Sequence, residues 1–246
     1  MIIETNGRRR SQTWFLPSGI TFSDVIAAYK PLGASSEAAS LINLASPGTN
    51  NLTKTGSPSW AAATGWTIPG SINNGYYASG ITTFTSVFVR YSNVITGQDV
   101  DKDACGCVVS TNSNFSIRNV YPQSSSVNFY QCTPGFLTSD KSYTPIQKLH
   151  YDGGYAYFYP AGVSGVSNNI VYFNGAEAGA DPGYGMGTVN NGYSVTLNHS
   201  YLKIGNFFVL NTPISYASYK IQAICFYNKI LSSSQISELS SSMANL

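Results

Sequence analysis

The sequence predicts an all-β fold, an antiparallel β-sandwich closed by one short C-terminal helix. Eighteen tyrosines and twelve phenylalanines accompany many Thr and Val residues, which are types that strands favour. Twenty-three glycines and eleven prolines supply turns. Roughly ten short stretches alternate between apolar and polar residues, with turn formers about every 8–12 residues, as in sandwiches and jelly rolls.

The bulk composition is that of a folded domain without a strong charge. Of the 246 residues, 43% are apolar and 10% are charged, whereas disorder needs the opposite balance. One sandwich can hold a chain of this length. The net charge of +2 is too small for a nucleic-acid surface. No apolar run approaches the roughly 20 residues of a membrane span. We therefore expect no nucleic-acid partner and no membrane insertion.

The first 24 residues are predicted to form an N-terminal arm, followed by a single domain over residues 25–246. Arg8, Arg9 and Arg10 form the one basic run, and Trp14 and Phe15 begin a short apolar segment that must be buried. This apolar segment packs either on its own domain or on a neighbouring subunit. For the arginines, a solvated arm is the plainer interpretation and docking onto a partner is the functional one.

The N-terminus has no basic segment followed by an apolar one, so we expect no signal peptide, synthesis in the cytosol and reduced thiols. The four cysteines lack the spacing of a zinc site: Cys105, Cys107, Cys132 and Cys225. A bridge from Cys105 or Cys107 to Cys132 is left open.

One long strand is expected within "ITTFTSVFVRYS". Its alternation puts Val87, Val89 and Tyr91 on one face and Phe88 and Arg90 on the other.

Turns and short elements are predicted around this strand. Asn174-Gly175 is a strong signal for a two-residue hairpin turn. A helical turn is expected over residues 37–42, and Trp60 and Trp66 are expected to anchor the core.

The C-terminal stretch "YKIQAICFYNKILSSSQISELSSSM" begins as a strand and ends as a helix. Strict alternation places five side chains on one face of the strand: Tyr219, Ile221, Ala223, Cys225 and Tyr227. Because Ile224 and Phe226 make the opposite face apolar too, we expect this strand to be buried on both sides near its end.

The helix that follows carries a capping box. Ser232 is the predicted N-cap, and Gln235 can reach back to its backbone N–H. Ile236, Leu239 and Met243 line one side at helical spacing. Such a short helix is not stable alone, so this apolar side must pack against the sandwich.

The same stretch carries a family resemblance. "FYNKILSSSQISEL", together with "IVYFNGAE" and "LKIGN", resembles the closing segments of concanavalin A-like, laminin-G-like jelly rolls. The likeness spans roughly residues 60–246. The earlier "AAYKPLGASSEAASLINLASPGTNNLTKTGSPSWAAATGWT" resembles an entry segment of tailed-phage structural proteins with this fold. The resemblance implies a jelly-roll domain of the kind found in virions.

Some relatives with this fold are glycosidases, which need two facing carboxylates. None of the four glutamates stands beside another acid in a predicted strand: Glu4, Glu37, Glu177 and Glu238. The histidines, His150 and His199, lie far apart, and no nucleophile elbow exists. We assign no catalytic residue and expect no enzyme activity.

Asp99, Asp101 and Asp103 stand at alternate positions, like the start of a calcium loop. Ala104 and Ser110 occupy the positions where an EF-hand needs Gly and Glu, so that loop is excluded. A looser Ca²⁺ site, common among laminin-G-like domains, is left open beside the plainer interpretation, a solvated acidic turn. No other cofactor is expected.

Tyrosines supply the candidate ligand site. Tyr155, Tyr157 and Tyr159 share one predicted strand face, and Tyr184 and Tyr193 flank a glycine-rich loop. Such rings stack on sugars and suit protein interfaces. The alternative is that they fill the core.

These observations and the resemblance lead to three functional hypotheses. The first is a non-enzymatic virion-surface protein of a tailed phage, made in the host cytoplasm, serving as a capsid decoration, head-fibre or tail-fibre module. Its arm would dock onto other virion proteins, its oligomer would be a homotrimer, and it would contact cell-surface glycans. The second is a free carbohydrate-binding lectin. The third, ranked last, is a glycoside hydrolase.

Overall fold

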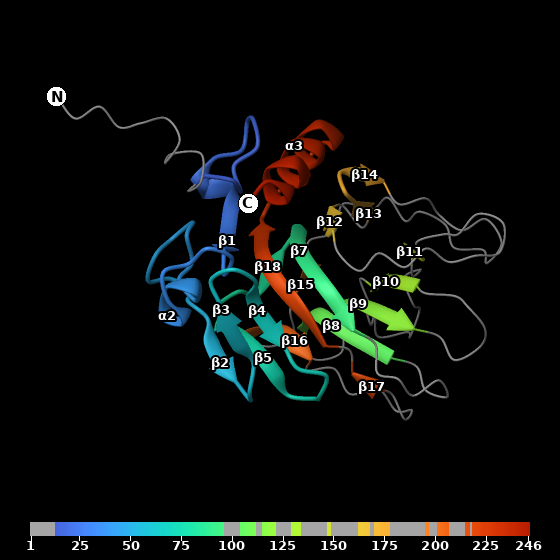
Figure 1. The fold of residues 1–246 in the computed structure, drawn as a ribbon. Helices are drawn as coiled ribbons and strands as arrows, with labels where there is room; N and C mark the ends of the chain where they lie inside the picture. Colours follow the sequence, from blue (N-terminus) through green and yellow to red (C-terminus); the bar gives the residue numbers. More distant parts are fainter. Residues whose placement is uncertain are drawn as a thin grey trace.

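A computed structural model describes most of the two ends of the chain and the strands between them. The described residues are 13–95, 104–111, 115–121, 129–133, 147–148, 162–167, 170–177, 195–196, 201–206, 215–216 and 218–246. Within them the fold is mostly β, with antiparallel sheets and one C-terminal helix, α3 (Ser233–Ala244) (Figure 1).

Two sheets account for nearly all the strands described. Sheet A runs in the order β14-β13-β12-β7-β18-β4-β3, with β1 also paired to β18. Its bounds are β1 (Val25–Tyr29), β3 (Ser59–Ala61), β4 (Gly65–Ile68), β7 (Ser86–Ile95), β12 (Gly162–Ser167), β13 (Ile170–Phe173), β14 (Ala176–Glu177) and β18 (Ser218–Tyr227).

Sheet B runs in the order β11-β10-β9-β8-β16-β5-β2, and β17 joins β8 as a parallel pair. Its bounds are β2 (Thr53–Thr55), β5 (Asn74–Ser79), β8 (Ala104–Thr111), β9 (Phe115–Tyr121), β10 (Phe129–Thr133), β11 (Gln147–Lys148), β16 (Tyr201–Asn206) and β17 (Ser215–Tyr216). The remaining elements are η1 (Phe22–Asp24), α2 (Glu37–Ser40), β6 (Thr83–Phe84) and β15 (Val195–Thr196).

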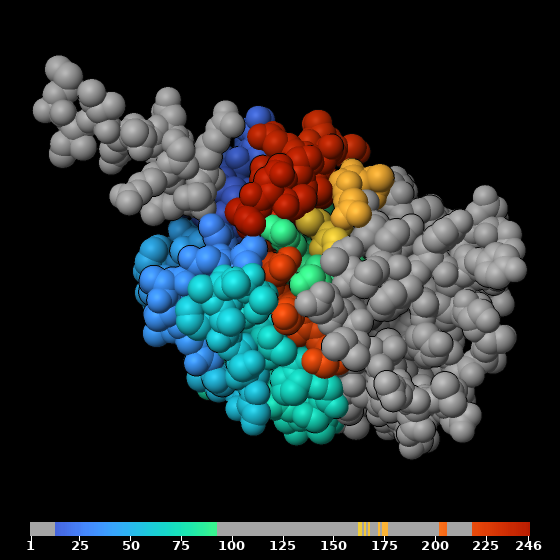
Figure 2. Space-filling model, viewed as in Figure 1, coloured from blue at the N-terminus to red at the C-terminus, as the bar shows by residue number. Residues whose placement is uncertain are grey.

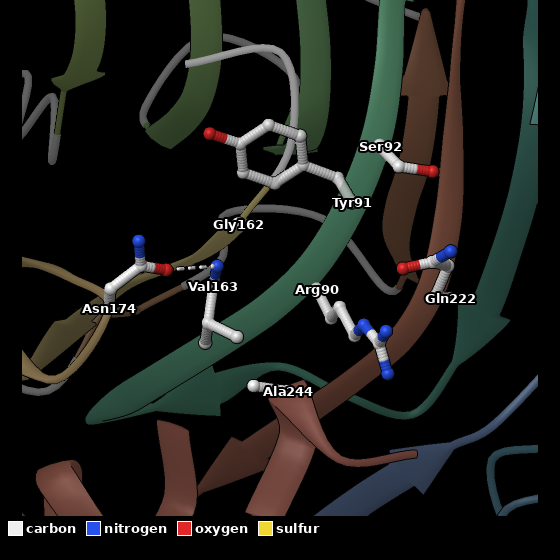
Figure 3. Close-up of a pocket in the computed structure, with 8 residues that line it drawn as sticks. All are labelled: Arg90, Tyr91, Ser92, Gly162, Val163, Asn174, Gln222 and Ala244. Atoms are coloured by element: carbon white, nitrogen blue, oxygen red, sulfur yellow. Dashed lines mark hydrogen bonds between the residues drawn. The ribbon is translucent and has the colours of Figure 1, made fainter. Parts of the chain in front are cut away.

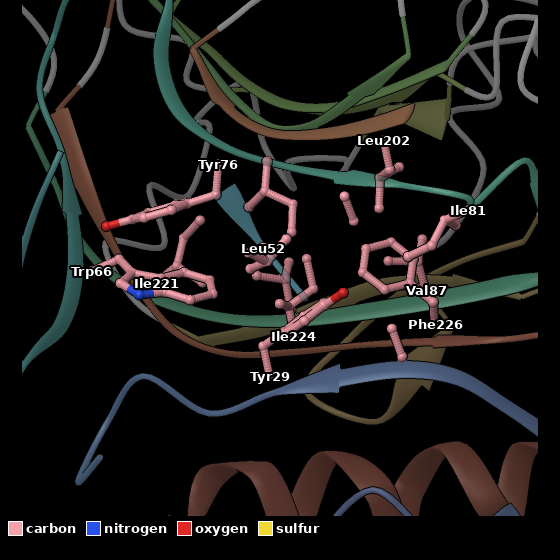
Figure 4. Packing of buried hydrophobic residues seen from close by; sticks show 14 of the residues in the cluster. Tyr29, Leu52, Trp66, Tyr76, Ile81, Val87, Leu202, Ile221, Ile224 and Phe226 are labelled. Carbon is pink, nitrogen blue, oxygen red and sulfur yellow. The ribbon is translucent and has the colours of Figure 1, made fainter. Parts of the chain in front are cut away.

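The first hydrophobic core lies between the two sheets. Sheet A contributes Trp66, Val87 and Ile221, and sheet B contributes Tyr76 and Leu202. Figure 4 shows side chains of both layers pointing into the space between them, with α3 beyond sheet A. The two sheets thus share one core, as the predicted β-sandwich requires, while the strand order of a jelly roll stays a prediction.

A second core lies on the outer face of sheet A, under α3. The helix buries Ile236, Leu239 and Met243 completely, as predicted. Each such side chain contributes about 2 kcal/mol when it leaves water. The capping box is also confirmed, because Ser232 Oγ accepts from Gln235 N and Gln235 Oε1 accepts from Ser232 N.

The predicted arm is partly corrected by this second core. Trp14 is 4% exposed and Phe15 is fully buried in it. The Phe15 carbonyl accepts a hydrogen bond from Tyr227 Oη at 2.9 Å, and Ser18 N donates to Glu238 of α3 at 2.9 Å. The apolar segment therefore packs on its own domain, and the buried Trp14 and Phe15 do not offer a docking surface. Figure 2 shows this segment alongside α3.

The last strand, β18, also departs from the prediction. Tyr219 and Ile221 face the first core, but so do Ile224 and Phe226, whereas Ala223, Cys225 and Tyr227 face the second core. The register of β18 against β7 shifts between Ile221 and Ala223, which leaves Gln222 as an extra residue. A bulge of this kind reverses the alternation of faces. The strand is nevertheless buried on both sides near its end, as expected.

Burial governs the chemistry of the Cys225 thiol. It is fully buried in the second core, and this burial raises the pKa of the thiol to about 12. Its Sγ lies 3.4 Å from the Tyr227 hydroxyl. Cys225 therefore stays protonated and packs as a small apolar residue.

Several smaller predictions are confirmed. Asn174 and Gly175 form the two-residue turn between β13 and β14, with φ values of 49° and 85°. Trp66 is fully buried and donates from Nε1 to Ser40 Oγ. Trp60 is only half-buried, at the margin of the first core. The expected helical turn is α2.

Gly165 allows β12 to pass beneath an aromatic ring. It pairs with Phe88 across β12 and β7, and a Cβ built on Gly165 would lie 2.1 Å from Cδ1 of Phe88. We predict that Gly165→Ala lowers the free energy of unfolding by about 1–3 kcal/mol through overpacking, measured by urea denaturation. Combining it with Phe88→Leu should cost less than the sum of the single changes. Additive costs would contradict this explanation.

Candidate functional site

A cavity of about 290 Å³ opens on the outer face of sheet A, where α3 ends. Three strands, one turn and the helix end line it, as Figure 3 shows. The lining residues are Arg90, Tyr91, Ser92, Gly162, Val163, Asn174, Gln222 and Ala244. The cavity therefore lies on regular elements of the fold, which can hold side chains more precisely than loops can.

The bulge in β18 places Gln222 at this cavity. A hydrogen bond fixes the backbone of this bulged residue, because the Gln222 carbonyl accepts from Leu32 N at 3.2 Å. Gly65 of β4 comes so close that a Cβ there would lie 2.2 Å from the Ile221 carbonyl oxygen. Because Ile221 faces the first core, alternation points the Gln222 amide to the outer face of the sheet, and the bulge turns Ala223 to that same face.

The hairpin turn positions Asn174. Its backbone N–H donates to the Val163 carbonyl at 2.8 Å, and its Oδ1 accepts from Val163 N at 2.9 Å. Figure 3 shows the amide nitrogen directed away from Val163. The next residue, Gly175, would place a Cβ 3.2 Å from the Cα of Ser237 on α3, so the turn rests directly on the helix.

Arg90 links the cavity to the helix. It projects from the outer face of β7, and its Nη1 donates to the main-chain oxygens of Met243 at 2.8 Å and Leu246 at 3.2 Å. A cation at a helix C-terminus is favourable because it opposes the negative end of the helix dipole. Burial lowers the pKa of the guanidinium, but an arginine in a protein keeps its proton at any physiological pH.

The polar groups of this lining are rich in hydrogen-bond donors. Arg90 supplies a positive charge, Asn174 and Gln222 supply amides, and Ser92 supplies a hydroxyl. Within the described part of the chain, the cavity lining includes no Asp, Glu, His or Cys. This arrangement can bind a small ligand that carries hydroxyls and hydrogen-bond acceptors.

Most of the residues predicted from sequence to form a site lie outside the described residues. This holds for the candidate ligand tyrosines, the candidate Ca²⁺ aspartates and the basic run: Tyr155, Tyr157, Tyr159, Tyr184, Tyr193, Asp99, Asp101, Asp103, Arg8, Arg9 and Arg10. Within the described part of the chain, no group of three or more His, Cys, Asp or Glu side chains could hold a metal ion.

The cavity residues were not predicted as a site. Arg90 was expected only on the strand face opposite to Val89 and Tyr91, and Asn174 only in its turn. The one local signal at Asn174 was the Asn-Gly pair, which reports a turn and not a ligand. Alternation placed Gln222 on the strand face opposite to Ile221, but nothing in the sequence marks the bulge beside it or indicates a ligand there.

No protein-family profile and no curated protein matches the chain. Solved structures do match its fold. A mutant sialidase of Trypanosoma rangeli that displays trans-sialidase activity aligns with 91% of this chain and 34% of its own, at a TM-score of 0.54 and 12% identity. The ligand-binding domain of botulinum neurotoxin serotype D, in complex with N-acetylneuraminic acid, aligns with 89% and 51%, at 0.55 and 9%.

The binding domain of botulinum neurotoxin serotype G gives similar values, with 88% of this chain and 50% of its own, at 0.56 and 8% identity. Identities this low show a shared fold alone. The chain spans between about a third and a half of the length of these structures. Among the described residues, no helix has both the length and the apolar character needed to cross a membrane.

The contact between Arg90 and the helix end can be tested directly. We predict that Arg90→Met loosens the last turn of α3, because the two main-chain oxygens lose a charged donor. The expected cost is about 1 kcal/mol of local stability, measured by hydrogen exchange of the peptide covering residues 233–246. Lys54→Met removes one charge from β2 in the other sheet and should leave this exchange unchanged.

Because Arg90 keeps its charge, the protection of this turn should be constant between pH 6 and 9 once intrinsic exchange rates are corrected. A loss of protection across this range in the unmodified protein would contradict the assignment.

Proposed function

We propose that this β-sandwich is a glycan-binding domain and that the cavity at the end of α3 holds one sugar unit. The observation that carries the proposal is the convergence of Arg90, Asn174, Gln222 and Ser92 on one hollow of the sheet surface. Sugars present many hydroxyls, and each needs a partner when it leaves water. The cavity, at about 290 Å³, is near the small end of the range for ligand pockets.

The structural neighbours support this proposal. One is a ligand-binding domain in complex with N-acetylneuraminic acid, and another is a sialidase. A shared fold does not transfer a function. The argument for this chain therefore depends on the side chains at its own cavity.

The proposed activity is binding without turnover. Hydrolysis of a glycosidic bond ordinarily needs a carboxylic acid and a carboxylate on opposite sides of that bond. The described residues that line the cavity offer neither group. An arginine, two amides and a hydroxyl can orient a sugar, but they give no general acid with a suitable pKa.

We further propose the virion surface as the setting of this domain, as a homotrimeric decoration or fibre module. This proposal is supported by the sequence resemblance to tailed-phage proteins. The burial of Trp14 and Phe15 in the domain's own second core limits the arm to the residues before them. Arg8, Arg9 and Arg10 then remain the candidates for contact with another virion protein.

Glycan binding should depend on the bulged glutamine. We predict saturable binding of the purified chain on a glycan array. For a sugar found there, we expect Gln222→Ala to weaken binding about tenfold in calorimetry, the effect of about one lost hydrogen bond. Gln131→Ala, on β10 of the other sheet, is the matched control and should bind as the unmodified protein does.

An array without any bound glycan would contradict the proposed function. Equal losses for Gln222→Ala and Gln131→Ala would place the site away from this cavity.

The docking proposal is tested by removing residues 1–12 alone. We expect the shortened chain to fold with an unchanged melting temperature, because Trp14 and Phe15 are kept, and to be incorporated into particles several-fold less. Copies per particle are counted by quantitative mass spectrometry. Replacing the three arginines with serine should give the same loss. Full incorporation of either variant would contradict the docking role.

Light scattering of the free protein tests the proposed trimer, and a monomer mass would contradict it.

A further inference from the structure

We infer that the cavity is selective for a sugar bearing a carboxylate, and that Arg90 binds this carboxylate side-on through Nε and Nη2. This inference deepens the proposed glycan site and rests on it. It depends on how the guanidinium is already used, on the charges around it and on the groups that face it.

The guanidinium is only partly used by the protein. Nη1 has two hydrogens, and both have partners in the main-chain oxygens of Met243 and Leu246. Nε and Nη2 carry the other three hydrogens. Among the described residues, neither atom has a hydrogen-bond acceptor.

The unused atoms form the right shape for a carboxylate. Nε and Nη2 present two parallel N–H groups on one edge of a planar group, and a carboxylate accepts both at once. A neutral sugar hydroxyl matches only one of these donors. The fork therefore distinguishes an acidic sugar from its neutral counterpart by both charge and geometry.

The guanidinium is also held in place before any ligand arrives. Its two bonds to the helix end fix the plane of the group and limit its rotation. A binding group that is already ordered loses little side-chain entropy on association. Arg90 is therefore suited to be the fixed point of the site.

The charges on this face favour an anion. Among the described residues that line the cavity, none is Asp or Glu. Tyr219 and Ile221 face the first core, so alternation places Lys220 between them on the outer face, where its Cα pairs with Ser92. A second positive charge thus lies on the same face, two residues from Gln222.

The two amides of the cavity would bind the other substituents of the sugar ring. Asn174 has its amide nitrogen directed away from Val163, and its other bonds already fix its orientation. Gln222 offers a donor and an acceptor from β18, on the other side of β7 from Asn174. Two amides flanking a guanidinium can hold the hydroxyl or acetamido groups of one sugar while the carboxylate sits on the fork.

The test compares acidic sugars with matched neutral ones. The probes are the methyl glycoside of N-acetylneuraminic acid and its carboxyl-reduced alcohol, and methyl glucuronide and methyl glucoside as a second pair. By calorimetry, the unmodified protein should bind one acid at least about tenfold more tightly than its neutral partner, as a charge-assisted hydrogen bond implies. Arg90→Lys keeps the charge but loses the fork, and should reduce this ratio several-fold.

Two controls separate recognition from folding. Melting temperatures show whether Arg90→Lys retains the fold. Gln222→Ala should weaken the acid and the neutral sugar alike, so that their ratio stays as in the unmodified protein. Lys54→Gln removes one positive charge from the other sheet and should leave the ratio unchanged.

Each outcome decides the inference. Neutral sugars bound as tightly as acidic ones would overturn it while leaving the proposed glycan site intact. An acid preference that survives in Arg90→Lys would place the carboxylate elsewhere and overturn it too. A glycan array with no ligand at all would remove the proposed function together with this inference.

Discussion

The burial of β18 on both faces is the constraint on which the rest of the fold depends. One face of this strand closes the core between the sheets, and the other carries Ala223, Cys225 and Tyr227, which must also be kept from water. Sheet B cannot cover this second face. The chain covers it with α3 and with the segment that begins at Trp14, and the capping box at Ser232 fixes where the helix starts. The two ends of the described chain, from Trp14 and through α3, are thus part of the core and not additions to it.

The candidate site follows from the same arrangement. Because α3 covers only part of the outer face of sheet A, the sheet is open again where the helix ends, and the cavity lies there. At the bulge where β18 reverses its alternation, Gln222 has no partner residue on β7, and it lies on the uncovered part of the outer face. The helix end then supplies the oxygens that hold Arg90. A bulged strand with two buried faces, a short helix and the β13–β14 turn together place Arg90, Asn174 and Gln222 around one hollow.

The sequence predicted the elements well and their combination poorly. Ser232, Gln235 and the apolar side of α3 could be found because capping and helical spacing are local patterns. The Asn174-Gly175 turn was found for the same reason. The faces of β18 were assigned wrongly after Ile221, since residues on both faces are apolar and a one-residue bulge leaves no trace in such a pattern. Arg90, Asn174 and Gln222 are spread over residues 90–222 of the chain, and only strand pairing brings them together.

The second core has a further consequence for how the domain connects to its surroundings. Trp14, near the first described residue, and Leu246, the last, pack against the same cluster under α3. Both ends of the described chain therefore emerge on one side of the molecule. Domains with neighbouring ends tolerate insertion into a loop of a host protein and relocation of their termini by circular permutation. Another polypeptide could therefore hold this domain as an insertion in one of its loops, with sheet B facing away from the point of insertion.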